Sequence, residues 1–294
     1  MHKLASVFLF IGLANGLAAE TKFAPTDWPN WRGLTSDGQA LLVDGLPTKW
    51  SETKNIVWKT PIPGRGHGTP AVVGERIYLA TADEDEMFQA VLCVDKADGK
   101  VVWQTKVHEG QFAIGLNTNA SHAGTAVVHD GERLFVNFVI GNQAFASAIG
   151  LDGKILWQKP IGKYKVHQGY GSSPMVYRDI VVMKADTKIG GAIVGLDKKT
   201  GREIWRQDRP KIANYTTPMV VEAAGRLQMV FCGCKLVTSL DPLTGKKLWE
   251  VPGSTEECVS TLVTDGTHIF ISGGWPKNHT AAIVADGSGK IAWQ

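Results

Sequence analysis

One short motif, Gly-Lys/Arg-x-x-Trp, recurs five times along the chain and limits the possible folds more than any other feature. Its glycine–tryptophan pairs are Gly99 and Trp103, Gly153 and Trp157, Gly201 and Trp205, Gly245 and Trp249, and Gly289 and Trp293. The tryptophans follow one another at spacings of 54, 48, 44 and 44 residues. A repeat of about 40 to 50 residues is typical of propellers and arrays, in which each repeat is one packing unit.

The repeats also share an internal order of strands and turns. Each opens on small residues, often with proline, as at 68–70, 172–174 and 216–218. An alternating strand such as 133–138 follows, and an Asp-x-x-Thr-Gly turn precedes the tryptophan. Aspartate can bond the backbone ahead of it, and glycine supplies the positive φ that closes such a hairpin. Four short strands per repeat predict an all-β propeller with blades at roughly 64–107, 118–161, 168–209, 213–253 and 257–294.

Trp58 stands outside these five blades. Residues 55–59 resemble the start of an outer strand, and an N-terminal strand of this kind usually completes the last blade of a propeller. The fifth repeat already has its own outer strand at Trp293, so Trp58 requires a further blade. We therefore expect an incomplete propeller over residues 55–294, with five blades and an N-terminal closing strand. The intact ring would have at least six blades, with seven or eight expected.

Composition and charge exclude several classes of protein. The chain has 294 residues, of which 44% are hydrophobic, and 31 Lys and Arg face 28 Asp and Glu. This composition is that of a globular protein, and it excludes intrinsic disorder and collagen-like structure. A formal charge of +3 is too small for a nucleic-acid surface or a basic membrane-binding patch. We expect a monomer that binds no nucleic acid.

The first residues read as a signal peptide. A short basic start is followed by an apolar stretch at 4–13 and small residues at 16–19, which predicts cleavage near Ala18 or Ala19. The apolar stretch is too short to span a membrane, which takes about 20 residues. Residues 1–19 are therefore interpreted as the signal peptide and 20–54 as an N-terminal extension. The mature chain is expected in the periplasm or outside a bacterial cell.

The repeat motif also resembles that of a known family. The sequences at 196–205 and 240–249 resemble the tryptophan-docking repeat of the quinoprotein-like, or pyrroloquinoline quinone (PQQ), β-propellers. That superfamily includes PQQ-dependent alcohol dehydrogenases and the outer-membrane assembly scaffold BamB. Residues 28–33 and 64–70 look like the secreted PQQ-like repeat proteins of planctomycete-type bacteria. The tryptophan-docking positions implied by this resemblance are Trp58 and the five glycine–tryptophan pairs named above.

The resemblance leaves more than one function open. The first hypothesis is an exported, non-enzymatic scaffold without a cofactor, which binds a protein or another macromolecule through its loop faces. The alternative is a periplasmic PQQ-dependent oxidoreductase with PQQ and calcium, and a third possibility is a propeller that binds a small ligand without turnover. The dehydrogenases carry adjacent cysteines, whereas Cys232 and Cys234 are separated by one residue, and their calcium ligands do not align here. The cysteines are interpreted as buried free thiols, with disulfides as the alternative.

A candidate site follows from the repeat geometry. The opening stretch of each repeat should form the innermost strand, so polar residues at these starts would converge on one mouth of a central channel. These residues are Arg65, His67, Asn119, His122, His167, Tyr170, Tyr215 and Cys258. The functional interpretation is a small-molecule or metal site, and the alternative is a set of ordinary polar loop residues. Arg65 would favour an anionic group. No catalytic residue and no metal site are predicted, because the three histidines sit at different offsets from their strands.

Overall fold

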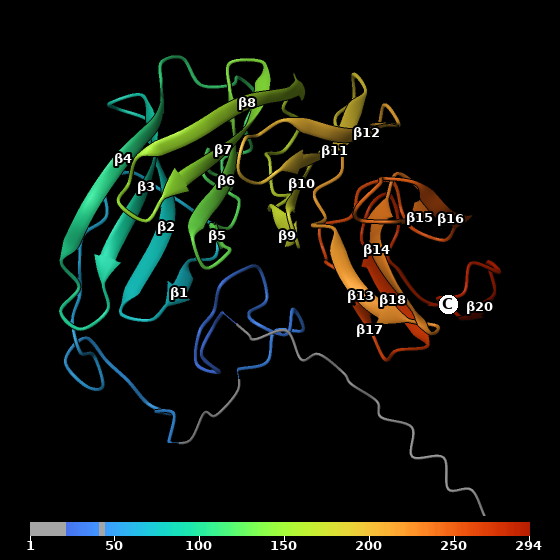
Figure 1. Ribbon diagram of the computed structural model, residues 1–294, viewed down its shortest axis with the longest axis horizontal. Helices are drawn as coiled ribbons and strands as arrows, with labels where there is room; N and C mark the ends of the chain where they lie inside the picture. The colour runs from blue at the N-terminus through green and yellow to red at the C-terminus, as the bar shows by residue number, and fades with distance from the viewer. Residues whose placement is uncertain (1–21, 41–44) are drawn as a thin grey trace, which may run out of the picture.

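Twenty short strands and no helix make up the part of the chain that the computed structural model describes, residues 22–40 and 45–294. The strands form five four-stranded antiparallel sheets, in each of which the strands lie in sequence order (Figure 1). We number these sheets as blades 1 to 5. The fold is therefore all-β and propeller-like, as the sequence predicts.

The bounds of the strands are as follows. Blade 1 consists of β1 (Ala71–Val73), β2 (Arg76–Asp83), β3 (Phe88–Asp95) and β4 (Val101–Glu109), and blade 2 of β5 (Val128–His129), β6 (Arg133–Ile140), β7 (Gln143–Gly150) and β8 (Ile155–Lys163). Blade 3 consists of β9 (Met175–Tyr177), β10 (Ile180–Ala185), β11 (Gly191–Asp197) and β12 (Glu203–Arg209). Blade 4 consists of β13 (Met219–Ala223), β14 (Arg226–Gly233), β15 (Leu236–Leu240) and β16 (Lys247–Pro252). Blade 5 consists of β17 (Val263–Thr264), β18 (His268–Gly273), β19 (His279–Val284) and β20 (Ile291–Trp293). The strands lie within the expected blade ranges, except that β4 and β8 each run two residues further.

The hydrophobic core is divided among the contacts between consecutive blades. Phe138 of β6 and Cys93 of β3 belong to one buried cluster, and Phe135 of β6 and Met183 of β10 belong to another. Two further clusters join blade 3 to blade 4 and blade 4 to blade 5. The middle strands are consequently buried on both faces, as β6 shows with six consecutive buried residues. Each blade therefore depends on its neighbour for stability, as in other repeat proteins.

The repeated tryptophan of each blade packs on the hairpin of the next. The Trp157 indole donates a hydrogen bond to the Lys198 carbonyl at 3.1 Å, and its ring covers Gly201 so closely that a Cβ there would lie 2.7 Å from it. Gly201 also has a φ of +69°, which favours glycine. Asp197 accepts the Thr200 backbone N–H at 2.8 Å and shapes this turn. The same arrangement joins Trp103 to Gly153 and Trp205 to Gly245.

The fifth hairpin departs from this pattern. Trp249 lies on Gly287, and its indole donates to Gln228 Oε1 of its own blade at 2.8 Å. A Cβ on Gly289 would instead meet Val251. The prediction that Gly289 is a docking position is therefore wrong, because the turn at 286–289 places its earlier glycine under the ring. Trp293 is 52% exposed, and no described residue forms a hairpin over it.

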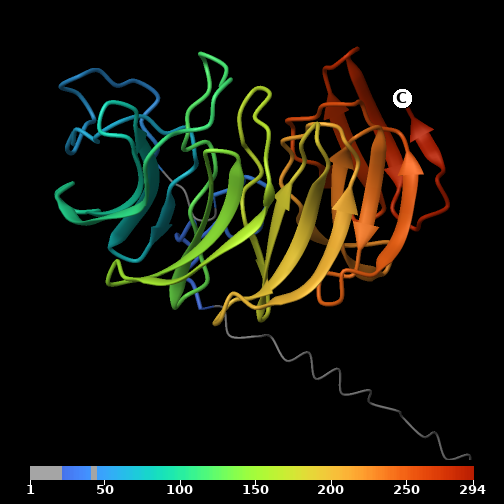
Figure 2. The same ribbon diagram turned by 90° about the horizontal axis from the view of Figure 1, so that it is seen from above.

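Trp58 packs on blade 1 without belonging to a strand. Its indole donates to the Lys96 carbonyl at 2.8 Å, and its ring covers Gly99, as the other tryptophans cover their glycines. Residues 55–59 form no strand, so the expected closing strand is not found. Among the described residues, no backbone pairing joins blade 1 to blade 5, and Figure 2 shows the five sheets side by side in sequence order. The number of blades in a complete ring stays a prediction.

The N-terminal extension crosses from one end of this row to the other. Trp28 exchanges backbone hydrogen bonds with Val72 of blade 1 at 2.6 and 2.9 Å, and the Pro29 carbonyl accepts the His129 N–H of blade 2 at 2.8 Å. The Trp31 indole donates to Thr261 Oγ1, just before blade 5, at 2.9 Å. We call residues 22–38 the N-terminal strap. It runs between blade 1 and the last blades in Figure 1 and ties them together.

Two other sequence predictions concern the ends and the cysteines. The proposed signal peptide, residues 1–19, lies outside the described residues. Within the described ranges, nothing helical is long or apolar enough to cross a membrane. All four cysteines are buried free thiols.

Candidate functional site

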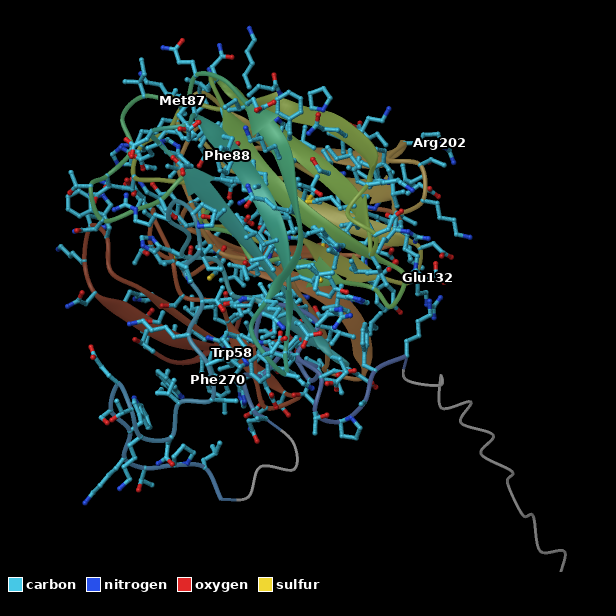
Figure 3. The ribbon with its side chains drawn as sticks, turned by 90° about the vertical axis from the view of Figure 1, so that its left-hand side faces the viewer. Trp58, Met87, Phe88, Glu132, Arg202 and Phe270 are labelled. Atoms are coloured by element: carbon cyan, nitrogen blue, oxygen red, sulfur yellow. The ribbon has the colours of Figure 1, made fainter. Side chains whose placement is uncertain are left out.

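The blades have two distinct ends, because successive turns of a meander alternate in direction. In blade 1, the β2–β3 turn before Met87 and Phe88 lies far from the hairpin on which Trp58 packs (Figure 3). The connections that lead into the inner strands emerge at the same end as the β2–β3 turn. Loops from all five blades therefore gather at this end.

A cavity of about 690 Å³ opens among these loops. Each blade contributes a residue that precedes its inner strand, and these are His67, Ser121, Tyr170, Tyr215 and Glu257. The β18–β19 connection, with Trp275 and Asn278, completes the wall. We call this space the channel-mouth cavity. Its size lies in the range of small-molecule sites, about 300–1,000 Å³.

Three of the eight residues proposed from the sequence line this cavity. His67, Tyr170 and Tyr215 face it from blades 1, 3 and 4. Tyr170 is held in place, because its hydroxyl donates to the Lys184 carbonyl at 2.9 Å and accepts from the Asn137 amide at 2.7 Å. The repeat geometry therefore brings part of the proposed set together.

The other predicted site residues of blades 1 and 2 do not line the cavity. Arg65 donates to the carbonyls of Thr118 and Ala120 and lies 3.6 Å from Glu84, so its guanidinium is already occupied. His122 stacks on Phe112 with ring centroids 4.3 Å apart, and burial lowers the pKa of this histidine. Asn119 is exposed on the loop and does not line the cavity. The expected ring of three histidines and an arginine is therefore not formed.

His167 lies beside the cavity in a charged cluster. Its Nε2 is 3.2 Å from Glu257 and 2.9 Å from the Lys188 ammonium, which is itself 3.7 Å from Glu257. Cys258 is 1% exposed, and its thiol lies 3.1 Å from Thr255 Oγ1. Neither residue is among those that line the cavity.

Glu257 is the functional candidate that the sequence analysis missed. Its side chain is only 13% exposed, and it is the one carboxylate that lines the described cavity. In the sequence it stands directly before Cys258, a residue predicted to lie at the channel mouth. A side chain one residue away points in another direction in an extended segment, so the neighbour reached the cavity instead.

Two buried hydroxyl groups of the wall have no hydrogen-bond partner. They are Ser121 Oγ and Tyr215 OH, on side chains that are 4% and 9% exposed. Burial, and then the nearby charge of Glu257, raise the pKa of the Tyr215 hydroxyl. This hydroxyl lies close to the Glu257 carboxylate and the Gln168 backbone, but no hydrogen bond of good geometry joins it to either group. Buried polar groups are nearly always paired. The described residues contain five buried polar side-chain atoms without a partner, and two of them, Ser121 Oγ and Tyr215 OH, belong to residues that line this one cavity.

A buried ionic cluster supports the wall from behind. Asp186 is bound by Lys184 at 3.0 Å and by Arg209 at 2.9 Å, and all three side chains are nearly inaccessible. Burial alone would raise the pKa of Asp186, but the two cations hold it below its ordinary value. Because Lys184 also offers its carbonyl to Tyr170, this cluster fixes one side of the cavity.

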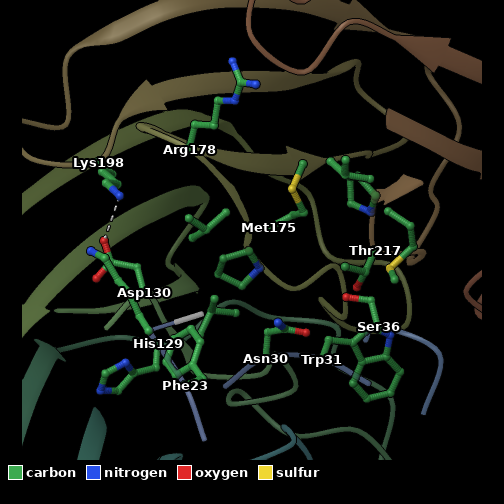
Figure 4. A pocket seen from close by; sticks show the side chains of 17 residues that line it. Phe23, Asn30, Trp31, Ser36, His129, Asp130, Met175, Arg178, Lys198 and Thr217 are labelled. Carbon is green, nitrogen blue, oxygen red and sulfur yellow. Dashed lines mark ion pairs between the residues drawn. The ribbon is translucent and has the colours of Figure 1, made fainter. Parts of the chain in front are cut away.

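A smaller cavity of about 320 Å³ lies under the N-terminal strap (Figure 4). Phe23 and Trp31 of the strap face Met175 and Thr217 of the blades across it. Lys198 is 3.5 Å from Asp130 at its edge. None of the described side chains that line this cavity has a buried polar atom without a partner, so the space is part of the packing around the strap.

Comparison with known proteins identifies the family. The sequence matches the family described as "Outer membrane protein assembly factor BamB" over residues 27–163 and again over 87–294. The chain belongs to this BamB family. A curated relative, the outer membrane protein assembly factor BamB of Alkalilimnicola ehrlichii, is 24% identical over 158 residues. That alignment covers 53% of this chain and 36% of the relative, so the chain spans about a third of the relative's length.

Solved structures agree with the fold. BamB from Moraxella catarrhalis superposes with a TM-score of 0.56 at 16% identity, over 81% of this chain and 63% of that chain. The quinohemoprotein alcohol dehydrogenase from Comamonas testosteroni gives a TM-score of 0.58 at 13% identity, over 90% of this chain and 47% of that enzyme. Identities this low support the shared architecture alone.

The absence of PQQ and calcium stays a prediction, and the described wall bears on calcium alone. Calcium takes about 6–8 oxygen ligands, whereas the described wall offers a single carboxylate, Glu257, which is already paired with His167 and Lys188. The described residues contain no group of three or more His, Cys, Asp or Glu arranged to hold a metal ion. Cys232 and Cys234 lie behind the wall, where Cys232 is near the Ser260 carbonyl and Cys234 is near Asp186.

Proposed function

We propose that this chain is an exported, BamB-like scaffold that binds a protein partner through the loops around the channel mouth. It acts by binding and not by catalysing a reaction. The family assignment supports this proposal, since its relatives are described as assembly factors. Export rests on the N-terminal sequence pattern and on the same distant relatives.

One observation carries the proposal: large apolar side chains are exposed around the channel mouth. Ile114 is 85% exposed, Val259 72%, Trp275 59% and Ile189 45%. Ile114 lies on the connection from blade 1 to blade 2, and Ile189 lies on the β10–β11 turn of blade 3. Val259, on the connection from blade 4 to blade 5, and Trp275, on the β18–β19 connection, line the cavity itself. Exposed apolar groups gathered on one face and surrounded by polar residues are typical of protein-binding surfaces.

Site-specific photo-crosslinking tests this face directly. A photoreactive amino acid is placed at Ile114 or Val259, and at Ile204 as the matched control. Ile204 is also an exposed isoleucine, at 42%, but it is the second residue of β12, at the opposite end of blade 3. In the cells that naturally produce the chain, we expect discrete protein adducts from Ile114 and Val259 and none from Ile204. Adducts from Ile204 alone, or from no position, would contradict the proposal.

A further inference from the structure

The two unpaired hydroxyls of the channel-mouth cavity are available to form hydrogen bonds with a bound ligand. Ser121 and Tyr215 line the cavity from blades 2 and 4, and neither buried hydroxyl makes a hydrogen bond of good geometry, although Tyr215 OH lies near the Glu257 carboxylate. A buried hydroxyl that is left unpaired costs folding free energy, which a polar ligand or ordered water recovers. Each hydroxyl can both donate and accept. The matching ligand therefore offers donors and acceptors together.

The charges around the cavity favour a neutral ligand. The carboxylate of Glu257 lies in the wall and would repel an anion. His167 and Lys188 lie 3.2 and 3.7 Å from the same carboxylate, and this pairing weakens its attraction for a cation. Arg65 is turned to Glu84 and to two backbone carbonyls. Glu257 keeps the ability to accept a hydrogen bond from a hydroxyl group.

The residues that line the wall also bear on the kind of ligand that the cavity can hold. Gly171 and Gly274 line the cavity, and neither has a left-handed φ. A Cβ on either would make an ordinary van der Waals contact, at 3.7 Å with Tyr215 or at 3.9 Å with Asn278, so a methyl group fits at both positions. At the rim, Trp275 is 59% exposed and offers an aromatic face next to the polar interior. A flat apolar surface beside hydroxyl and carboxylate groups suits a molecule with an apolar face and a polar edge.

We propose that the channel-mouth cavity binds a neutral saccharide. Its hydroxyl groups pair with Ser121, Tyr215 and Glu257, and the apolar face of a sugar ring packs on Trp275. The cavity of about 690 Å³ accommodates one or two sugar units. This proposal goes beyond the protein scaffold and does not depend on it. Both proposals use Trp275 at the rim, but the polar groups that would hold the saccharide, Ser121, Tyr215 and Glu257, are not part of the apolar protein-binding surface.

A glycan array tests the proposal with purified full-length mature chain. The array carries neutral saccharides from one to six units, and positives are measured by calorimetry beside inorganic phosphate and succinate. We expect at least one neutral saccharide to bind, and neither anion to bind. An affinity that stops rising at one or two units identifies a free or terminal sugar as the source, whereas one that rises further identifies a polysaccharide chain. Binding of no neutral saccharide, or of the anions in their place, overturns the proposal.

Two hydroxyl deletions separate a binding role from a structural one. Tyr215→Phe and Ser121→Ala should each weaken saccharide binding by about 3- to 10-fold, the usual effect of one hydrogen bond. The thermal stability of the free protein should stay the same or rise, because an unpaired buried group has been removed. Tyr177→Phe, on the inner strand β9 away from the cavity lining, is the matched control and should leave affinity unchanged. Unchanged affinity in both cavity variants contradicts the assignment of these hydroxyls.

Discussion

The first four hairpins and the fifth hairpin carry similar sequences but make different contacts. In blades 1 to 4, the indole of a preceding tryptophan donates to a turn carbonyl and covers a glycine with positive φ. In blade 5, the preceding Trp249 bonds Gln228 of its own blade, and Trp293 at the end of the series is 52% exposed. The motif thus forms a contact between neighbouring blades. Its tryptophan stabilises the fold only where the hairpin of the next blade covers the indole.

The largest expected effect comes from deleting a docked tryptophan and comparing it with the undocked one. Trp157→Ala should lower the free energy of unfolding by about 3–5 kcal/mol, because a large buried ring leaves a cavity between blades. Trp157 is 7% exposed. Trp293→Ala should change the free energy of unfolding by less than about 0.5 kcal/mol, which is usual for substitutions of exposed residues. Guanidinium unfolding followed by circular dichroism measures both. Equal losses would break the comparison.

A glycine pair isolates the contribution of the docked ring from that of backbone strain. Gly245 and Gly225 have φ values of +67° and +71°, but a Cβ on Gly245 would lie 2.5 Å from Trp205, whereas Gly225 faces open space. Gly225→Ala should cost about 1 kcal/mol from the left-handed backbone. Gly245→Ala should cost about 3 kcal/mol, since the ring must also move. If denaturant unfolding gives the same loss for both, close packing of the ring is not what requires glycine.

The strap offers a third comparison, between a tryptophan that joins blades and one that does not. Trp31→Ala should lower stability by about 2 kcal/mol, through the lost contact area and the hydrogen bond to Thr261. Trp50 belongs to the same N-terminal extension but is 67% exposed, so Trp50→Ala should have little effect. Thermal unfolding of the two variants decides the point. A stable Trp31→Ala protein would show that the strap does not hold the first and last blades.

The interface between blades 1 and 2 should respond to pH, unlike the tryptophan contacts. His108 of β4 packs against Phe138 and Phe145 of blade 2, and burial lowers its pKa to about 4. The unfolded chain, with an ordinary histidine pKa near 6.5, binds more protons between these values. The contribution of the buried, neutral His108 to the free energy of unfolding is therefore fully present above about pH 6.5, and it is lost as the pH falls towards 4.

Comparing wild type with His108→Phe measures that loss. Between pH 7 and pH 5, wild type should lose about 1 kcal/mol more than the variant, a value reduced for the partial exposure of the imidazole. Urea unfolding at the two pH values gives this difference. Parallel losses would mean that the histidine is not buried between the blades as described.

The fold was largely predictable because its determinants are local and repeated. The turn at 197–201 is specified by an aspartate that bonds the backbone and a glycine with positive φ, both within five residues. The fifth turn escaped prediction because it contains two glycines, and only packing selects Gly287 over Gly289. The segment at Trp58 has the tryptophan but no partner strand among the described residues, so its sequence alone gave the wrong secondary structure.

The sequence predicted where the candidate site lies but not which side chains face it. Repeat geometry places 67, 170 and 215 at one mouth, because equivalent positions of successive blades face a common axis. The direction of each side chain depends on packing that a single sequence does not encode. His122 turns to Phe112, Arg65 turns to Glu84, and the carboxylate of Glu257 enters the cavity beside the expected Cys258. The unpaired hydroxyl of Ser121 likewise becomes visible only when the wall is assembled.

The central claim is that the channel-mouth face is the binding face, and one measurement tests it most directly. A photoreactive group at Ile114 reports partner contact while a charge is introduced elsewhere. Val259→Asp places the charge on the same face, and Ile204→Asp places it on an exposed position at the opposite end of a blade. The account predicts that Val259→Asp abolishes the Ile114 adduct while Ile204→Asp leaves it intact, with both proteins folded by circular dichroism. An adduct that survives Val259→Asp and disappears with Ile204→Asp would contradict it.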